Sequence, residues 1–138
     1  MTAARAAALS LVAGLTISSS RAADGPAVLT FLGRAELPIG MRFADTEVGG
    51  LSAIAYDEIS GRYLTVSDDR SERAPARVYT LAIDLSGGRL GEGGAEVLAM
   101  ATLRTPEGRT FEDSAIDGEG IAPAGDGGFF VSSEGEAR

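Results

Sequence analysis

Acidic side chains gather at three points of the sequence, and carboxylates can bind metals and move protons. The first cluster is Asp68-Asp69-Arg70, the second lies within residues 113–119, and the third is Glu134-Gly135-Glu136. Oxygen ligands in such numbers suit Ca²⁺, which takes roughly six to eight of them. The EF-hand pattern is absent, and acids at strand ends are also common as solvated turn caps. The clusters predict a divalent-cation site, with solvated caps as the alternative.

The composition limits the chemistry that can accompany these acids. All 12 basic residues are Arg, and the chain contains no Lys, His, Asn, Gln, Cys or Trp. A Ser-His-Asp triad, a Lys Schiff base and His or thiolate metal ligands are therefore excluded within this chain. Ser67, Ser132 and Ser133 have no His to activate them, and the Gly-x-Ser-x-Gly elbow is absent. These serines are expected to be structural.

The first 22 residues have the pattern of a secretory signal peptide. Arg5 precedes a largely apolar run of 12 residues, 6–17, and Ser20 and Ala22 form a small-x-small site, so cleavage is predicted after Ala22. The run is short for a membrane span, although an uncleaved anchor or Ala-rich helix is the alternative. The predicted location is periplasmic or secreted, with no membrane attachment after cleavage.

Net charge narrows the partners of the mature chain. The signal removes two of the 12 basic residues and none of the 20 acidic ones, so the formal charge moves from −8 to −10. An acidic exported chain is a poor candidate for binding nucleic acid or anionic membranes. It is a reasonable candidate for binding divalent cations.

Short strands separated by glycine predict an all-β fold of antiparallel sheets. Residues 77–85 alternate most clearly, with Tyr79, Leu81, Ile83 and Leu85 on one face. Further strands are expected at 27–37, 95–103 and in two hairpins, 50–68 and 117–136, while 39–48 is expected to be a loop.

The two hairpins resemble one another. Ile54-Ala55 matches Ile121-Ala122 at an offset of 67, and Val66-Ser67-Asp68-Asp69 matches Val131-Ser132-Ser133-Glu134 at an offset of 65. One unit used twice is typical of a β-propeller, although chance similarity of two hairpins is the alternative. Residues 23–138 would supply about two blades, so we expect the N-terminal, incomplete part of a larger propeller. The acids ending equivalent strands would then lie at the same end of the fold.

Several motifs in order resemble those of the esterase-like activity of phytase family, the phytase-like domain. They are Gly49-Gly50-Leu51-Ser52 with Tyr56-Asp57, Gly61-Arg62-Tyr63 with Ser67-Asp68-Asp69-Arg70, Pro75 to Tyr79, Asp117-x-Glu119-Gly120-Ile121, and Ser132-Ser133-Glu134-Gly135. The resemblance implies an exported β-propeller with acids at one end that acts on phosphoesters. By position, the implied metal ligands are Asp68, Asp69, Asp117, Glu119 and Glu134.

The leading hypothesis is a metal-assisted phosphoester hydrolase. Carboxylates would hold Ca²⁺, and Asp69, Glu119 and Glu134 are the catalytic candidates. Arg70 and Arg77 would bind the substrate phosphate. The alternatives are a non-catalytic periplasmic propeller that binds a ligand with structural acids, and an inactive truncated fragment.

Overall fold

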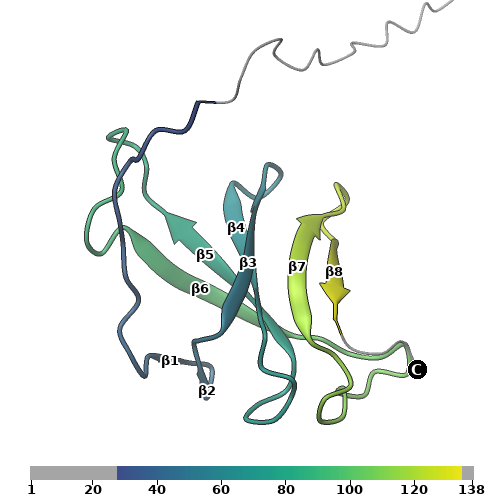
Figure 1. The fold of residues 1–138 in the computed structure, drawn as a ribbon. Coiled ribbons are helices and arrows are strands. Elements are labelled where there is room, and N and C mark those ends of the chain that lie inside the picture. Colours follow the sequence, from purple (N-terminus) through teal and green to yellow (C-terminus); the bar gives the residue numbers. More distant parts are fainter. Residues whose placement is uncertain (1–27, 135–138) are drawn as a thin grey trace, which may run out of the picture. The chain divides into compact units, whose positions relative to one another are not determined.

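The computed structural model describes residues 28–134, and this part of the chain contains strands and no helix (Figure 1). The all-β class with antiparallel sheets is therefore confirmed. Within the same residues, no helical span has the length and hydropathy that crossing a membrane requires. The predicted signal peptide, residues 1–22, lies outside the described part. The strands are β1 (Arg42–Phe43), β2 (Thr46–Glu47), β3 (Leu51–Asp57), β4 (Arg62–Ser67), β5 (Arg77–Ile83), β6 (Ala95–Thr102), β7 (Gly118–Pro123) and β8 (Phe129–Ser133).

The strands form three antiparallel sheets, all within residues 31–138, the second of the two units into which the chain divides. The largest is a four-stranded meander in the order β3-β4-β5-β6, and β1-β2 and β7-β8 are hairpins. Consecutive strands pair with their neighbours within each sheet, as is usual for antiparallel sheets. The predicted strands at 77–85 and 95–103 and both predicted hairpins are present, with ends that differ by a few residues.

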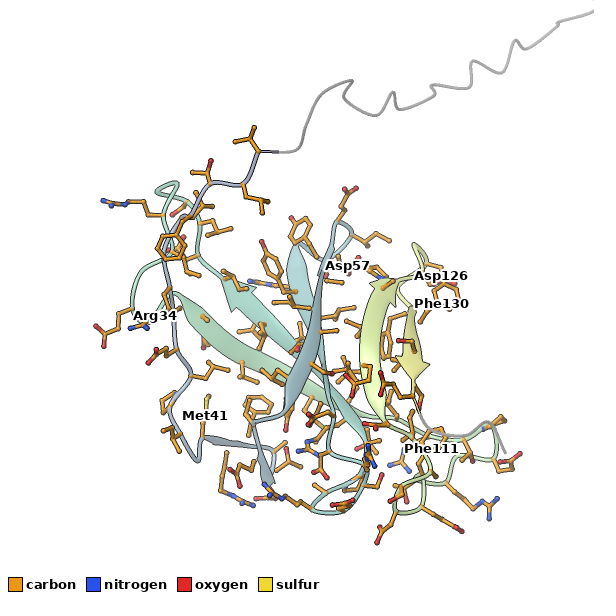
Figure 2. All side chains as sticks on the ribbon, in the orientation of Figure 1. Arg34, Met41, Asp57, Phe111, Asp126 and Phe130 are labelled. Atoms are coloured by element: carbon orange, nitrogen blue, oxygen red, sulfur yellow. The ribbon has the colours of Figure 1, made fainter. Side chains whose placement is uncertain are left out.

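The core lies on one face of the four-stranded sheet. Tyr79 and Leu81 of β5 pack with Val48 and Val97, and Tyr79 is fully buried. The segment before β3 covers this cluster with partly buried side chains, among them Met41 (Figure 2). On the opposite face of β5, Val78 is only 2% exposed, and Thr80 and Ala82 are partly buried. Packing on both faces therefore holds β5 in place and fixes the position of the residues at its ends.

Two predictions for the N-terminal part were wrong. Over its described residues, 28–37, the expected strand forms only an isolated bridge between Gly33 and Leu90. The expected loop at 39–48 contains the β1-β2 hairpin instead. Its turn places Ala44 and Asp45 at positive φ, and the Thr46 hydroxyl donates to the carbonyl of Phe43. Side-chain hydrogen bonds of this kind are not visible as a hydrophobic period.

Strand β7 lies beside β3 and β4 although more than 50 residues separate them in sequence (Figure 1). The Ser52 hydroxyl donates to the carbonyl of Gly118 at 2.5 Å. A Cβ at Gly118 would lie 2.6 Å from Cγ2 of Val66, so only glycine allows this close approach. The two hairpins thus meet where β7 begins.

Candidate functional site: a carboxylate cluster between two hairpins

The two hairpins have the same construction at the end where the acids lie. The amide of Asp68 donates to the carbonyl of Gly50 at 2.7 Å, and the amide of Glu134 donates to that of Asp117 at 3.1 Å. Each hairpin also has a register shift next to this point, between Leu51 and Ala53 or between Gly118 and Gly120. Equivalent positions therefore differ by 117 − 50 = 67 on the first strand and 134 − 68 = 66 on the second. Glu134 corresponds to Asp68, one residue away from the alignment with Asp69 that the sequence suggested.

Asp117, Glu119 and Glu134 converge at this end of the β7-β8 hairpin. Each offers a carboxylate oxygen, and the three oxygens lie within 4.8 Å of one another. Asp117 immediately precedes β7, Glu119 is the extra residue at the register shift, and Glu134 immediately follows β8. A bulge commonly turns a side chain away from the regular alternation. The hairpin's own geometry therefore brings three of the five predicted metal ligands together.

Arg70 connects this cluster to the first hairpin. Nη2 of Arg70 lies 2.5 Å from Oδ2 of Asp117, whose side chain is 8% exposed. The backbone carbonyl of Arg70 accepts the amide of Ser114 at 2.7 Å. The Arg70 side chain is itself half exposed, at 53%. Arg70 therefore neutralises the buried acid of the cluster and keeps one side of its charge open to solvent.

Electrostatics single out Glu119 within the cluster. The pKa of its carboxyl lies above the ordinary value, first because the surrounding chain removes part of its hydration, and then because the carboxylates of Asp117, Glu134 and Asp68 lie near it. Arg70 opposes this shift. A crowded group of acids binds protons more tightly for the same reason that it attracts a divalent cation. Asp68 takes part in this field, although it lies outside the group of three.

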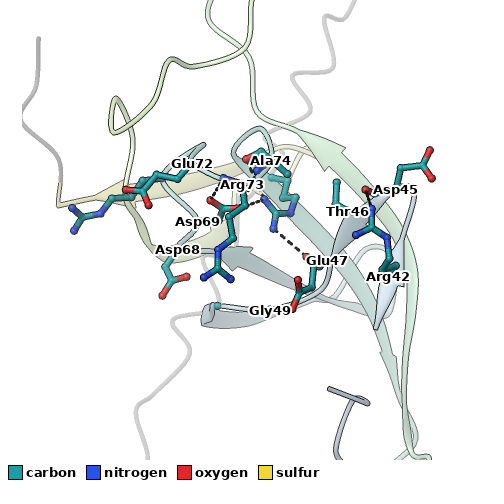
Figure 3. A pocket seen from close by; sticks show the side chains of 13 residues that line it. Arg42, Asp45, Thr46, Glu47, Gly49, Asp68, Asp69, Glu72, Arg73 and Ala74 are labelled. Carbon is teal, nitrogen blue, oxygen red and sulfur yellow. Dashed lines mark hydrogen bonds and ion pairs between the residues drawn. The ribbon is translucent and has the colours of Figure 1, made fainter. Parts of the chain in front are cut away.

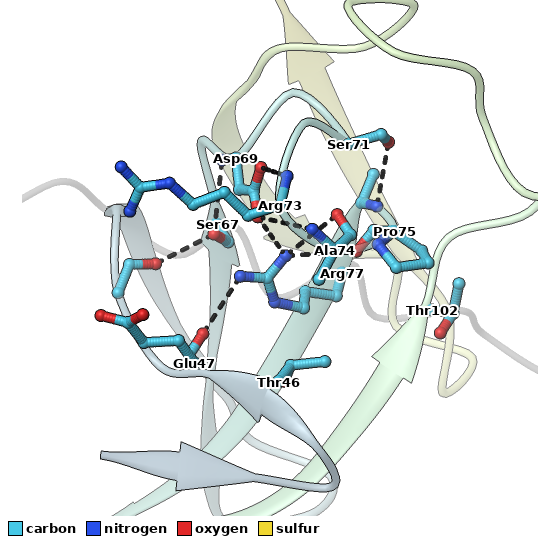
Figure 4. A network of polar contacts seen from close by, with 12 residues as sticks. Thr46, Glu47, Ser67, Asp69, Ser71, Arg73, Ala74, Pro75, Arg77 and Thr102 are labelled. Atoms are coloured by element: carbon cyan, nitrogen blue, oxygen red, sulfur yellow. Dashed lines mark hydrogen bonds and ion pairs between the residues drawn. The ribbon is translucent and has the colours of Figure 1, made fainter. Parts of the chain in front are cut away.

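Asp69 lies in a different environment, paired with Arg77 (Figure 4). Its Oδ2 is 2.8 Å from Nη1 of Arg77, and the two side chains are 10% and 4% exposed. Burial alone would raise the pKa of Asp69, but hydrogen bonds from Arg77 and from the amides of Arg73 and Ala74 hold it below its ordinary value. The same pairing and a bond to Tyr79 raise the pKa of Arg77 despite its burial. Both charges are thus engaged with each other rather than with solvent.

A cavity of about 540 Å³ adjoins Arg70 and lies between the β1-β2 hairpin and the β4-β5 connection (Figure 3). Its lining includes Arg42 and Arg73, which no sequence motif marks as site residues. Among the described residues, Arg73 forms no ion pair, and Arg42 donates to the carbonyl of Asp45. The only sequence signal for Arg73 was its place in the polar segment after Asp69, which does not distinguish it from any exposed Arg.

The three converging oxygens fit a hard divalent cation. Two ligands that each lie about 2.3–2.6 Å from Ca²⁺ can be at most about 5 Å apart. The separations within 4.8 Å satisfy this limit, and all three donors are carboxylates, the ligands such ions prefer. The cluster could therefore hold a metal ion, with water or substrate oxygens completing its shell.

Residues 28–134 thus define an all-β protein of antiparallel hairpins with a carboxylate cluster of metal-binding type. A family model described as Phytase-like, esterase-like activity of phytase, matches residues 46–138. Because the match covers more than half of the chain, the protein belongs to this family, as its motifs indicated. Neither the curated proteins nor the solved structures gave a match. A phytase-like or esterase-like function is supported at the level of the family.

Proposed function

We propose that this protein is an exported, metal-assisted phosphoester hydrolase whose cation is held by Asp117, Glu119 and Glu134. The observation that carries the proposal is the convergence of these three carboxylates within 4.8 Å, beside the half-exposed side chain of Arg70. A cation next to an Arg suits an anionic substrate, and phosphoesters are the anions that the family name suggests. Ca²⁺ is our proposed ion because the donors are all carboxylates.

The chain's own residues would divide the work between anion binding and proton transfer. When bound, Ca²⁺ would neutralise charge on a phosphate oxygen. Arg70 would hold a second phosphate oxygen, and Arg73 extends the cationic surface into the adjoining cavity. Glu119 and Glu134 are the exposed carboxylates of the cluster, and we assign Glu119 to accept a proton from an attacking water.

Arg77 and Asp69 receive a different role in this proposal from the one their sequence positions suggested. Arg77 is 3% exposed and its charge faces Asp69, so a substrate would reach it only after displacing that carboxylate. Asp69 already accepts two backbone amides and Arg77. We therefore assign substrate contact to Arg70 and Arg73, and structural support to the Asp69–Arg77 pair.

We further propose that the β3–β6 sheet and the β7-β8 hairpin belong to successive units of a β-propeller. A four-stranded meander followed by a hairpin whose first strand lies beside the first strand of the meander is the arrangement expected of adjacent blades. The matching backbone bonds of Asp68 and Glu134 support an internal repeat. The residue pattern of 1–22 supports cleavage after Ala22 and a periplasmic or secreted location.

The test is hydrolysis of phytate and of a chromogenic phosphodiester by the purified protein, in Ca²⁺ and in chelator. We expect activity that chelator removes and that Glu119→Gln reduces by about 100-fold or more, as for a general base. Glu112→Gln, at an exposed acid outside the cluster, is the matched control and should retain activity. Hydrolysis that survives both chelator and Glu119→Gln would contradict the metal mechanism.

A non-catalytic binding module is the second candidate, and one observation favours it. Arg70 already pairs with Asp117 and joins the two hairpins, as a structural ion pair would. In that case Ca²⁺ would raise the unfolding temperature without any phosphoester being cleaved. The same preparation distinguishes the two functions, because stabilisation and turnover are measured separately.

A further inference from the structure

Arg77 uses its guanidinium to hold three parts of the chain together (Figure 4). Nη1 donates to the Asp69 carboxylate at 2.8 Å and to the carbonyls of Ala74 and Pro75 at 3.3 Å. Nη2 donates to the carbonyl of Glu47 at 3.1 Å, and Nε donates to the Tyr79 hydroxyl at 2.7 Å. The side chain is 4% exposed, so these contacts replace its hydration. Every nitrogen of the guanidinium is therefore engaged within the protein.

These contacts fix the two walls of the cavity that adjoins Arg70. On one wall, Asp69 accepts the amides of Arg73 and Ala74, which closes the first turn of the β4-β5 connection around the carboxylate. On the other wall, the Tyr79 hydroxyl lies 2.7 Å from the Thr46 hydroxyl and donates to the carbonyl of Glu47 at 3.0 Å. Arg77 contacts Asp69, Tyr79 and the carbonyl of Glu47, so it connects both walls.

Arg70 depends on this arrangement because it directly follows Asp69. The next residue, Ser71, has φ of 66° and its amide donates to the carbonyl of Asp69 at 2.5 Å, so the backbone turns back tightly at Arg70. Between the fixed Asp69 and this reversal, the side chain of Arg70 is directed toward Asp117. A displacement of Asp69 would move the backbone from which Arg70 reaches the acidic residue.

We propose that Arg77 is a positioning residue that holds Arg70 in place for anion binding, acting through Asp69 and without touching the substrate. The inference rests on the proposed function for the identity of the anion, and on the described contacts for the positioning. Lysine could not replace Arg77, since one ammonium has no planar fork with which to reach a carboxylate, a phenol and a carbonyl in three directions.

The first test measures binding of inorganic phosphate by calorimetry at saturating Ca²⁺. Arg70→Gln should weaken phosphate binding by about tenfold or more, the loss of one charge-assisted hydrogen bond. Arg77→Lys should weaken it by a similar factor, and the double variant should be no worse than the poorer single variant, because both act through one contact. Tyr79→Phe, which keeps the charge of Arg77, should give a smaller loss of about threefold. Arg62→Lys, at an exposed Arg on the far end of β4, should stay within about twofold of the wild type.

The proposal would be overturned if the fold-losses of phosphate affinity of the two single variants multiply in the double variant, or if folded Arg77→Lys binds phosphate as tightly as the wild type. If Arg77→Lys does not fold, Tyr79→Phe takes its place. Its loss of phosphate affinity should then be absent or smaller when Arg70→Gln is already present. A merely structural role would lower the urea midpoint in these variants and leave the phosphate affinity of the folded protein unchanged.

A second readout separates failure of this inference from failure of the proposed function. A double-mutant cycle with Arg70→Gln and Asp117→Asn measures their coupling from shifts in urea midpoint, without any ligand. We expect a coupling in the wild type that is lost in the Arg77→Lys background and reduced in the Tyr79→Phe background. If the wild type binds no phosphate, the proposed substrate is wrong, and this cycle still decides whether Arg77 positions Arg70. A coupling that persists in both backgrounds would show that it does not.

Discussion

Replacing Asp69 by Asn tests whether this acid is a structural partner of Arg77 or a member of the metal site. The change preserves shape and removes the charge that faces Arg77 at 2.8 Å, leaving a buried guanidinium without its counter-ion. Removing one partner of a buried ion pair costs about 3–5 kcal/mol. The remaining acceptors, the Tyr79 hydroxyl and three carbonyls, still solvate Arg77, so we expect the low end, about 3 kcal/mol.

Urea unfolding followed by far-UV circular dichroism measures this loss, since the chain has no Trp. For a domain of this size the expected loss corresponds to a fall of about 10–20 °C in unfolding temperature. Asp126→Asn is the matched control, because Asp126 is exposed and accepts one amide, that of Gly128, within its own turn. It should cost less than about 1 kcal/mol. Ca²⁺ affinity should be nearly unchanged in Asp69→Asn. A stability loss below about 1 kcal/mol together with lost Ca²⁺ binding would refute the reasoning and return Asp69 to the metal site.

Three further outcomes follow from the same contacts. The pKa of Asp69 in the folded protein lies below its ordinary 3.8, so the ion pair's contribution to stability is complete above that pH and is lost as the pH falls through the lower, folded value. The difference in urea midpoint between wild type and Asp69→Asn should therefore be constant from about pH 7 to 5 and shrink below about pH 4. Gly50→Ala should destabilise the protein by at least about 1–2 kcal/mol, because Gly50 has φ of 57° and an added Cβ would overlap the Asp68 carboxylate. Gly49→Ala is the control, because there is open space around Gly49, and it should have a clearly smaller effect in the same unfolding assay. Arg73→Gln should weaken inorganic phosphate binding by a few-fold to tenfold in calorimetry without changing the urea midpoint, and an unchanged phosphate affinity would remove Arg73 from the site.

The parts of the fold that sequence reasoning predicted are those governed by local period. Residues 77–85 alternate because β5 has two distinct faces, and Tyr79 and Leu81 do face the core as expected. Residues 28–37 also carry apolar side chains, yet Leu29 and Phe31 are 96% and 87% exposed, and no partner strand pairs with the segment within the described residues. A hydrophobic pattern indicates that a segment can be a strand, but pairing requires a neighbour that the pattern does not contain.

The site divides in the same way. The motifs included Asp117, Glu119 and Glu134 among five candidate ligands, and these three lie together because the register of one hairpin brings them together. The separation of Asp69 from this group was not predictable from the cluster itself. Asp68 and Asp69 are neighbours in sequence, but only Asp69 meets a buried Arg that follows eight residues later. Neighbouring acids at a strand end point in different directions. The acid that meets a buried Arg is held by that Arg, and only the other one remains available to bind a ligand.

Direct titration of the wild-type protein with Ca²⁺ by calorimetry tests the central claim, that Asp117, Glu119 and Glu134 form a cation site. We predict one saturable site per chain, weakened at least roughly tenfold by Glu119→Gln, because ligand charge sets Ca²⁺ affinity, and retained in Glu112→Gln. Absence of saturable binding, or equal affinity in wild type and Glu119→Gln, would contradict it.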